Sequence, residues 1–191
     1  MKSILYAFLS FFLFSSCASF SDKMVKNNKE NLSENDLSKL EGTYELFPDL
    51  RYNEKGSAEL INSQDSRVSD LNYFVSFKET KQDGFGSYFV DINFVSGNKL
   101  KFTTKKDNVE IESFEVGGKL KNGLFYLDNR YLKRNGIPYL AGGYTNYKTR
   151  IGLAKDDGLL VNYAYDNSGA ILFLFWAGSD YNLGYHYKRI Q

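Results

Sequence analysis

The chain has 191 residues, with 24 Lys or Arg, 23 Asp or Glu and a single His, which gives a formal net charge of +1. This balance argues against a nucleic-acid-binding protein, because phosphate contacts need a basic face. One Cys and one His exclude an intramolecular disulfide and a zinc site made of those ligands. We therefore expect no cofactor and no bound metal, with an all-carboxylate site as the sole metal alternative.

The first residues have the pattern of a secretory signal peptide. Lys2 supplies a positive charge, the stretch 4–14 is almost wholly apolar, and the small residues Ser15 and Ser16 follow. A charged start, an apolar stretch of about 7–15 residues and small residues at its end mark an export signal. The apolar stretch is shorter than the roughly 20 residues that span a bilayer. We predict that residues 1–16 are removed on export.

The end of this stretch, Leu13-Phe14-Ser15-Ser16-Cys17, resembles the lipobox of bacterial lipoproteins. In that family the chain is cut just before the cysteine, which then carries the lipid; Phe14 stands where leucine is usual. The resemblance implies that Cys17 is lipidated and anchors the protein to the cell envelope. In lipoprotein sorting, Asp directly after the cysteine marks retention at the inner membrane, so Ala18 implies the outer membrane. The alternative is an ordinary signal peptide with an incidental thiol at Cys17.

Residues 17–36 are expected to form the lipidated cysteine and a flexible tether. Ser, Asp, Lys and Asn dominate this segment, so it buries too little apolar surface to offset the entropy of ordering. At its end, Ser33 followed three residues later by Asp36 predicts one or two helical turns over 33–40. These turns lead into a single domain over 37–191.

Alternation of apolar and polar residues predicts short strands through this domain. The first covers 41–47 and ends at Pro48. A long polar loop, 49–70, follows; we interpret it as an insertion, with a functional loop as the alternative. The later strands are expected at 71–77, 88–94, 99–105, 109–116, 147–153, 159–165, 170–177 and 183–189.

Irregularities in the alternation predict bulges and turns. A phase slip near Glu112-Ser113 predicts a β-bulge. Asp156-Asp157-Gly158 and Asn167-Ser168-Gly169 predict tight turns between strands. About eight to ten short strands with almost no helix predict an all-β antiparallel meander, which hides its strand edges best as a closed barrel.

The start of the domain resembles that of the lipocalins. Gly42-Thr43-Tyr44 follows a short helical turn, as Gly-x-Trp does in that family, with Tyr in place of Trp. The resemblance implies a lipocalin-like barrel in which a late basic residue packs over the aromatic ring. Arg189 can do so, because it lies two residues after Tyr187 and is expected on the same face of the last strand. We predict that Gly42, Tyr44 and Arg189 meet where the barrel closes, with a cation–π contact of about 0.5–2 kcal/mol.

Six aromatic residues fall on the inward parity of the predicted strands and are the candidate ligand-binding residues: Tyr73, Phe77, Tyr88, Phe94, Tyr163 and Tyr165. No Lys or Arg shares their rows, so a ligand lined by them would be flat or aliphatic and uncharged. The alternative is that they fill the core. Tyrosines also crowd the last third of the chain, where they suit either packing or the binding of a ligand or partner.

Residues that point to catalysis are few. The acid pairs are Asp156-Asp157 and Glu110/Glu112. The first is explained by its place in a turn and the second by an exposed strand face, so neither requires a catalytic role. His186 is expected on the surface of a strand. We therefore expect a lipid-anchored, non-enzymatic envelope protein that binds a small apolar ligand or a partner protein. The alternatives are a structural or accessory component of an envelope complex and a carboxylate-dependent hydrolase.

Overall fold

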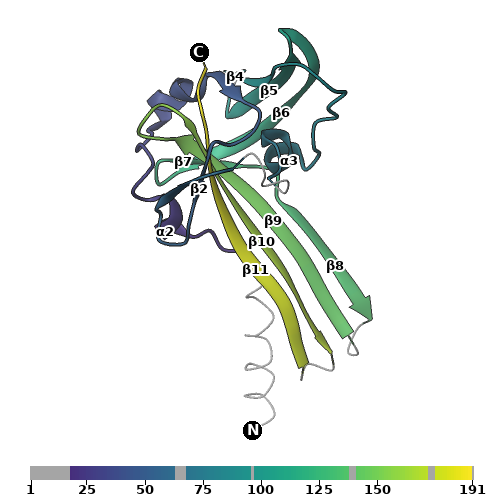
Figure 1. Cartoon of the computed structure of the whole chain (residues 1–191). Coiled ribbons are helices and arrows are strands. Elements are labelled where there is room, and N and C mark those ends of the chain that lie inside the picture. Colours follow the sequence, from purple (N-terminus) through teal and green to yellow (C-terminus); the bar gives the residue numbers. More distant parts are fainter. Residues whose placement is uncertain (1–17, 63–67, 96, 138–140, 172–174, 191) are drawn as a thin grey trace.

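The computed structural model describes residues 18–62, 68–95, 97–137, 141–171 and 175–190 (Figure 1). The predicted signal peptide over 1–16 and the predicted lipidation site Cys17 lie outside these residues. So do 63–67 of the loop and 172–174 of the strand predicted over 170–177. Within the described residues, no helix is both long and apolar enough to cross a membrane.

The described chain forms one 11-stranded antiparallel sheet, which confirms the predicted all-β antiparallel fold. Along the sheet the strands are β1 (Gly42–Glu45), β4 (Tyr88–Phe94), β5 (Lys99–Lys106), β6 (Val109–Lys121), β7 (Leu124–Leu127), β9 (Ala141–Leu153), β10 (Leu159–Ile171), β11 (Phe175–Tyr187), β2 (Leu50–Tyr52) and β3 (Ala58–Leu60). A further strand, β8 (Tyr131–Ile137), pairs with β9. The order ends at β1 and β3, so a closed barrel is not confirmed.

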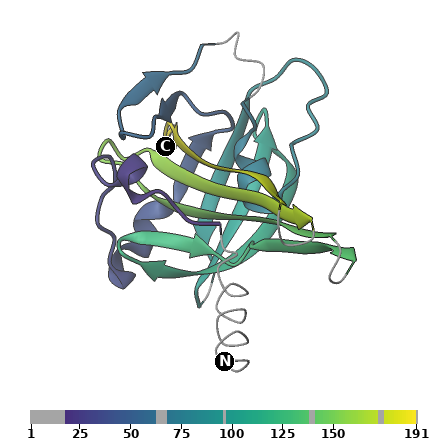
Figure 2. The same ribbon diagram turned by 90° about the horizontal axis from the view of Figure 1, so that it is seen from below.

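The two ends of the domain meet beside the sheet. The N–H of Glu45 donates to the carbonyl of Lys188 (2.9 Å), and the N–H of Ile190 donates to the carbonyl of Thr43 (2.7 Å). Seen from below, the blue and teal strands of the first half lie across the green and yellow strands of the second half (Figure 2). The hydrophobic core lies between these two groups of strands and contains Leu40, Tyr44, Val90, Phe102, Phe125, Ile151, Val161 and Tyr187.

The turns predicted over 33–40 are present as η2, a 3-10 helix over Glu34–Leu40. The carboxylate of Asp36 accepts hydrogen bonds from the backbone N–H of Ser33 (3.2 Å) and from its hydroxyl. These bonds cap the helix and direct Leu37 and Leu40 into the core.

The segment predicted as a strand at 71–77 is instead a helix, α3 (Leu71–Ser76). Asp70 caps it, because its Oδ1 accepts from the N–H of Tyr73 at 2.9 Å. Phe77 ends it in the left-handed conformation, with a φ of 60°. The side chains that face the core follow the helical spacing i, i+3 and i+4: Leu71, Phe74 and Val75. The strand prediction was wrong because the same segment also alternates with period two.

The predicted flexible tether is also wrong where the structure describes it. Helix α2 (Asp22–Val25) buries Met24 and Val25 against the sheet. Arg150 of β9 is 1% exposed, and its Nη1 donates to Oδ1 of Asp22 at 2.8 Å. A buried guanidinium needs hydrogen-bond acceptors, and this segment supplies them. Composition indicated disorder because it contains no information about the sheet surface against which Met24 and Val25 pack.

Two further predictions about irregularities have different outcomes. The bulge is present one residue before the predicted place: Lys105 pairs with Glu110 and Thr104 with Glu112, which leaves Ile111 unpaired. The turn predicted at Asn167-Ser168-Gly169 is wrong, because these residues lie inside β10. Glycines on the neighbouring strands allow this close pairing; a Cβ on Gly178 would lie 2.4 Å from the carbonyl oxygen of Asn167.

Candidate functional site

Strands β8 to β11 form a ribbon that extends away from the body of the protein (Figure 1). Strands β9, β10 and β11 each have 13 residues and pair with one another along their whole length. In the described residues, strands of the body pair with them only near the core: β7 pairs with β9 at 150–151, and β2 pairs with β11 at 184–186. The remaining length therefore has one sheet layer with two faces.

Four tyrosines stand side by side on one face of this ribbon, one from each strand. The register pairs Tyr131 with Tyr147, Tyr147 with Tyr165, and Tyr165 with Tyr181. Their rings stack, with centroid separations of 4.6, 6.3 and 4.8 Å and interplanar angles of 9°, 9° and 20° along the row. Tyr131 is 37% exposed and Tyr181 is 43% exposed. We call these four residues the tyrosine row.

The tyrosine row continues into the core through further aromatic rings. Phe77, at the end of α3, meets Tyr147 edge-on at 4.5 Å. Tyr163 lies one step below the row and contacts Tyr147 at 6.1 Å and Tyr73 at 6.4 Å. Burial raises the pKa of Tyr147 and Tyr163, so both hydroxyls stay neutral at physiological pH. The row is thus an exposed edge of a packed aromatic cluster, which fixes its position.

Beyond the row, toward the tip of the ribbon, the same face carries polar side chains, one of which is a lysine. The next residues in register are Lys133, Thr145, Asn167 and Ser179. The hydroxyl of Thr145 donates to Oδ1 of Asn167 at 3.3 Å. The face therefore combines an apolar stripe with hydrogen-bonding groups and one positive charge, an arrangement suited to contact with a flat surface.

The structure brings together four of the six predicted ligand-binding residues. Ring contacts link Tyr73, Phe77, Tyr163 and Tyr165 through Tyr147.

Tyr88 and Phe94 lie elsewhere, on β4. The hydroxyl of Tyr88 donates to Asp83 at 2.8 Å, and the ring of Phe94 packs against the core. All six side chains nevertheless belong to one hydrophobic cluster: Tyr163 is buried within it, and the other five pack against it. Tyr73 lies in α3 and Phe77 at its C-terminal end, so this helix brings both rings against those of β9 and β10.

The sequence alone does not reveal the tyrosine row, although tyrosines crowd the last third of the chain. Tyr131 lies between the strands predicted at 109–116 and 147–153, and Tyr181 precedes the last predicted strand. The row forms only through the pairing register of β8 to β11. The alternation of residues within one strand does not determine which residues of two strands pair.

His186 is buried rather than on the surface, with 3% of the residue exposed. Its Nδ1 lies 2.5 Å from Oδ1 of Asp49, and its Nε2 lies 3.1 Å from Oδ1 of Asp156. The three residues thereby tie the start of β2 to the turn between β9 and β10. In the described part of the chain, no group of three or more His, Cys, Asp or Glu side chains is arranged to hold a metal.

Comparison of the chain with protein-family models, with curated proteins and with solved structures finds no match.

Proposed function

We propose that this is a lipid-anchored, non-enzymatic protein of the cell envelope, held in the outer membrane through Cys17, that binds an envelope partner protein with the tyrosine row. The observation that carries the binding part is the stacking of four tyrosines in one register, with both end residues exposed. Tyrosine buries a large area at a small loss of side-chain entropy and keeps a hydroxyl for a partner.

A contact surface outside the fold is favoured over a cavity inside it because α3 occupies the space between the strands. Phe74 is 1% exposed and its ring lies 5.4 Å from those of Tyr163 and Tyr185. The carbonyl of Phe74 also accepts hydrogen bonds from Asn129 and Thr149. We further propose that the sheet closes as a lipocalin-like barrel, through the hydrogen bonds that join 43–45 to 188–190.

A small apolar ligand is the second candidate for the tyrosine row. The packing of Tyr73, Phe77 and Tyr163 beneath the row supports this second candidate, because these rings form an uncharged binding surface for a flat or aliphatic molecule. The acid pairs support the non-enzymatic part: Asp156 is engaged by His186, and Glu110 and Glu112 flank the bulge.

Anchoring is tested with Cys17→Ser in the native host. The expected result is that the wild-type chain partitions with membranes and carries a mass increase on Cys17, whereas the variant is recovered in the soluble fraction. One acyl chain binds only marginally, so several chains are needed for firm attachment. A variant that stays membrane-bound with an unchanged mass would contradict lipid anchoring.

Binding is tested by site-specific photo-crosslinking in the native host. A photoreactive phenylalanine replaces Tyr131 in one strain and Tyr181 in another, with Phe85, a fully exposed loop residue, as the matched control. We expect one and the same envelope protein to be captured from both row positions and not from position 85. Equal capture from all three positions contradicts a partner site on the row. A co-purifying apolar molecule that protects the row from labelling supports the second candidate instead.

A further inference from the structure

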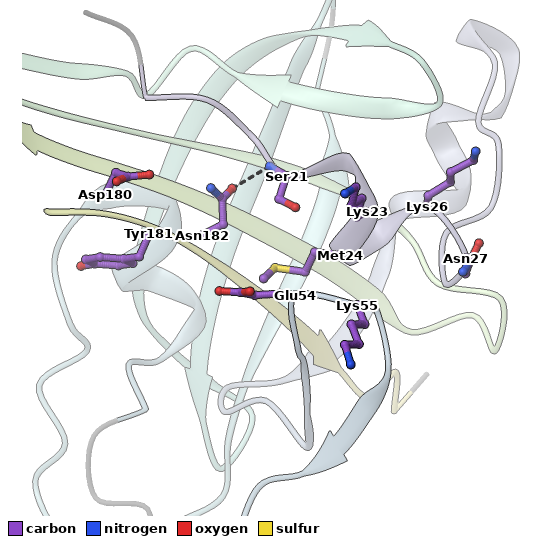
Figure 3. Close-up of a pocket in the computed structure, with 10 residues that line it drawn as sticks. All are labelled: Ser21, Lys23, Met24, Lys26, Asn27, Glu54, Lys55, Asp180, Tyr181 and Asn182. Carbon is purple, nitrogen blue, oxygen red and sulfur yellow. Dashed lines mark hydrogen bonds between the residues drawn. The ribbon is translucent and has the colours of Figure 1, made fainter.

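A groove of about 700 Å³ lies at the edge of β11, on the side away from β10 (Figure 3). One wall is the segment 21–27, which includes α2. The second is the turn at 54–55, and the third is 180–182 of β11. β2 covers the edge of β11 only at 184–186, so the groove begins where that pairing ends.

The charged side chains around the groove are separated by sign. Lys23, Lys26 and Lys55 lie on the side of α2, whereas the carboxylates of Glu54 and Asp180 lie on the side of Tyr181 (Figure 3). None of these five side chains makes an ion pair with another residue in the described ranges, although ion pairs form elsewhere on the surface. The groove thus offers positive charge at one end and negative charge at the other.

The walls of the groove are held in place by the packing of the N-terminal segment. The backbone N–H of Ser21 donates to Oδ1 of Asn182 at 2.8 Å, and Nδ2 of Asn182 donates to the carbonyl of Ser19 at 2.9 Å. Met24 forms the apolar floor and is 3% exposed. It sits directly on Gly184, where a Cβ would lie 2.8 Å from its Cγ and Sδ atoms. The separated charges therefore belong to a fixed surface.

We infer that this groove binds a zwitterionic phospholipid headgroup in which a phosphate is joined to a primary ammonium. The lysines face the phosphate, and Glu54 and Asp180 accept hydrogen bonds from the ammonium. A quaternary ammonium is recognised by cages of several aromatic rings. Of the described residues that line the groove, Tyr181 alone has an aromatic ring, so a primary ammonium fits better.

The membrane as the source of this headgroup rests on the proposed lipid anchoring. Cys17 precedes Ser19 by two residues, which span at most about 7 Å of chain. Because Ser19 is fixed to Asn182 in the wall of the groove, acyl chains on Cys17 would enter the bilayer beside the groove. Headgroups of the same leaflet would then be present at high local concentration.

The test uses the full chain from the native host in neutral detergent, titrated with glycerophosphoethanolamine by calorimetry. Glycerophosphocholine, glycerophosphoglycerol and inorganic phosphate are the comparison probes. We expect the primary ammonium probe to bind more tightly than the other three. Lys23→Gln with Lys55→Gln, and separately Glu54→Gln with Asp180→Asn, should each weaken its binding about fivefold or more. Lys119→Gln with Lys121→Gln removes the same charge from exposed positions of β6 and should change nothing.

The outcomes separate this inference from the proposed function. Equal binding of glycerophosphoglycerol or phosphate shows that the groove responds only to negative charge and overturns the inference, as does the absence of saturable binding. If the chain is lipidated but binds no headgroup, the headgroup site is overturned and the proposed lipid anchor is not. A chain without lipid that still binds glycerophosphoethanolamine supports the groove and overturns the membrane as its source. Nanodiscs with and without ethanolamine lipid, compared for protection of Lys55 from acetylation, then distinguish membrane lipid from the free probe.

Discussion

Arg189 lies over the ring of Tyr44, with the guanidinium carbon 5.1 Å from the ring centroid, and its Nη2 donates a hydrogen bond to the tyrosine hydroxyl at 2.6 Å. The hydroxyl in turn donates to the carbonyl of Leu40 at 3.0 Å. Burial raises the pKa of Tyr44 to about 12, so the hydroxyl keeps its proton and both bonds. The contact between these two residues is the one that the sequence predicted, and it joins the first strand to the end of the chain.

Arg189→Lys is expected to lower the free energy of unfolding by about 1–2 kcal/mol, because lysine cannot reproduce a planar group that stacks and donates in several directions. Nε of Arg189 also donates to the carbonyl of Asp157 at 2.9 Å. Urea unfolding followed by circular dichroism measures the change. Lys188→Ala, at the exposed neighbouring position, is the control and should stay within about 0.5 kcal/mol of wild type.

Tyr44 and Tyr187 are both fully buried, but their hydroxyls differ. The hydroxyl of Tyr187 has no hydrogen-bond partner among the described residues. Tyr187→Phe removes a buried polar atom that makes no bond, so we expect stability to be unchanged or to rise by about 1 kcal/mol. Tyr44→Phe removes two hydrogen bonds and should cost about 1–2 kcal/mol. If Tyr187→Phe destabilised the protein as much as Tyr44→Phe does, its hydroxyl would have a partner that the described residues do not show.

Stability should fall at alkaline pH through buried tyrosines such as Tyr52. Burial, followed by the nearby charges of Asp156 and Asp49, raises the pKa of Tyr52 to about 12 in the folded protein. Its unfolded pKa is about 10, so the folded state holds the proton more tightly. The stability from this group is therefore complete below pH 10 and is lost as the pH rises to 12. Urea unfolding at pH 9, 10 and 11 should show this fall, and a smaller one for Tyr52→Phe. Identical slopes for the two proteins would contradict the assignment.

Asp70 fixes the helix that the sequence did not predict. Its Oδ1 accepts from the N–H of Tyr73 at 2.9 Å, and its Oδ2 accepts from the N–H of Thr80 at 2.6 Å, with the residue 2% exposed. Asp70→Ala leaves two N–H groups without acceptors and should cost about 2–3 kcal/mol. Asp70→Asn keeps one oxygen and should cost less. Wild-type stability of Asp70→Ala would show that neither bond matters.

The sequence predicted the strands whose alternation is clean and local. β4 and β5 agree with expectation because Val90, Ile92 and Phe102 alternate with polar residues and are fully buried. The segment after Asp70 satisfies both periods, and the cap at Asp70 decides for the helix. The sequence predicts a turn at Asn167-Ser168-Gly169 because such residues suit turns, but they lie inside β10. In the fold, the same small residues allow close pairing with the neighbouring strands.

The candidate site was less predictable than the fold. Tyr163 and Tyr165 were identified, but the tyrosine row also needs Tyr131 and Tyr181, which only the pairing of distant strands brings beside them. Register between strands is a tertiary property, set by the hydrophobic faces together. The groove depended on a segment that composition indicated to be disordered.

Arg150 should decide whether that segment stays attached to the sheet. Its Nε donates to Asn162 and its Nη1 to Tyr126 and Asp22, each at 2.8 Å. The guanidinium carbon also lies 4.4 Å from the ring centroid of Phe20. Arg150→Met fills similar space without the donors. Because the side chain of Asp22 is 75% exposed, no buried charge is left behind, and we expect a loss of about 2–3 kcal/mol.

In Arg150→Met, the N-terminal segment should detach from the sheet before the whole domain unfolds. In this variant, trypsin should cleave at Lys23 and Lys26 at urea concentrations where the domain still gives its native circular dichroism spectrum, since the hydrogen bonds from Arg150 to Asp22 and to the carbonyl of Ser21 are lost. Arg51→Met removes an exposed arginine whose ion pair with Glu59 lies on the surface, and it should leave these sites protected. Cleavage at Lys23 and Lys26 in wild type at the same rate as in Arg150→Met would mean that residues 18–32 are a flexible tether after all.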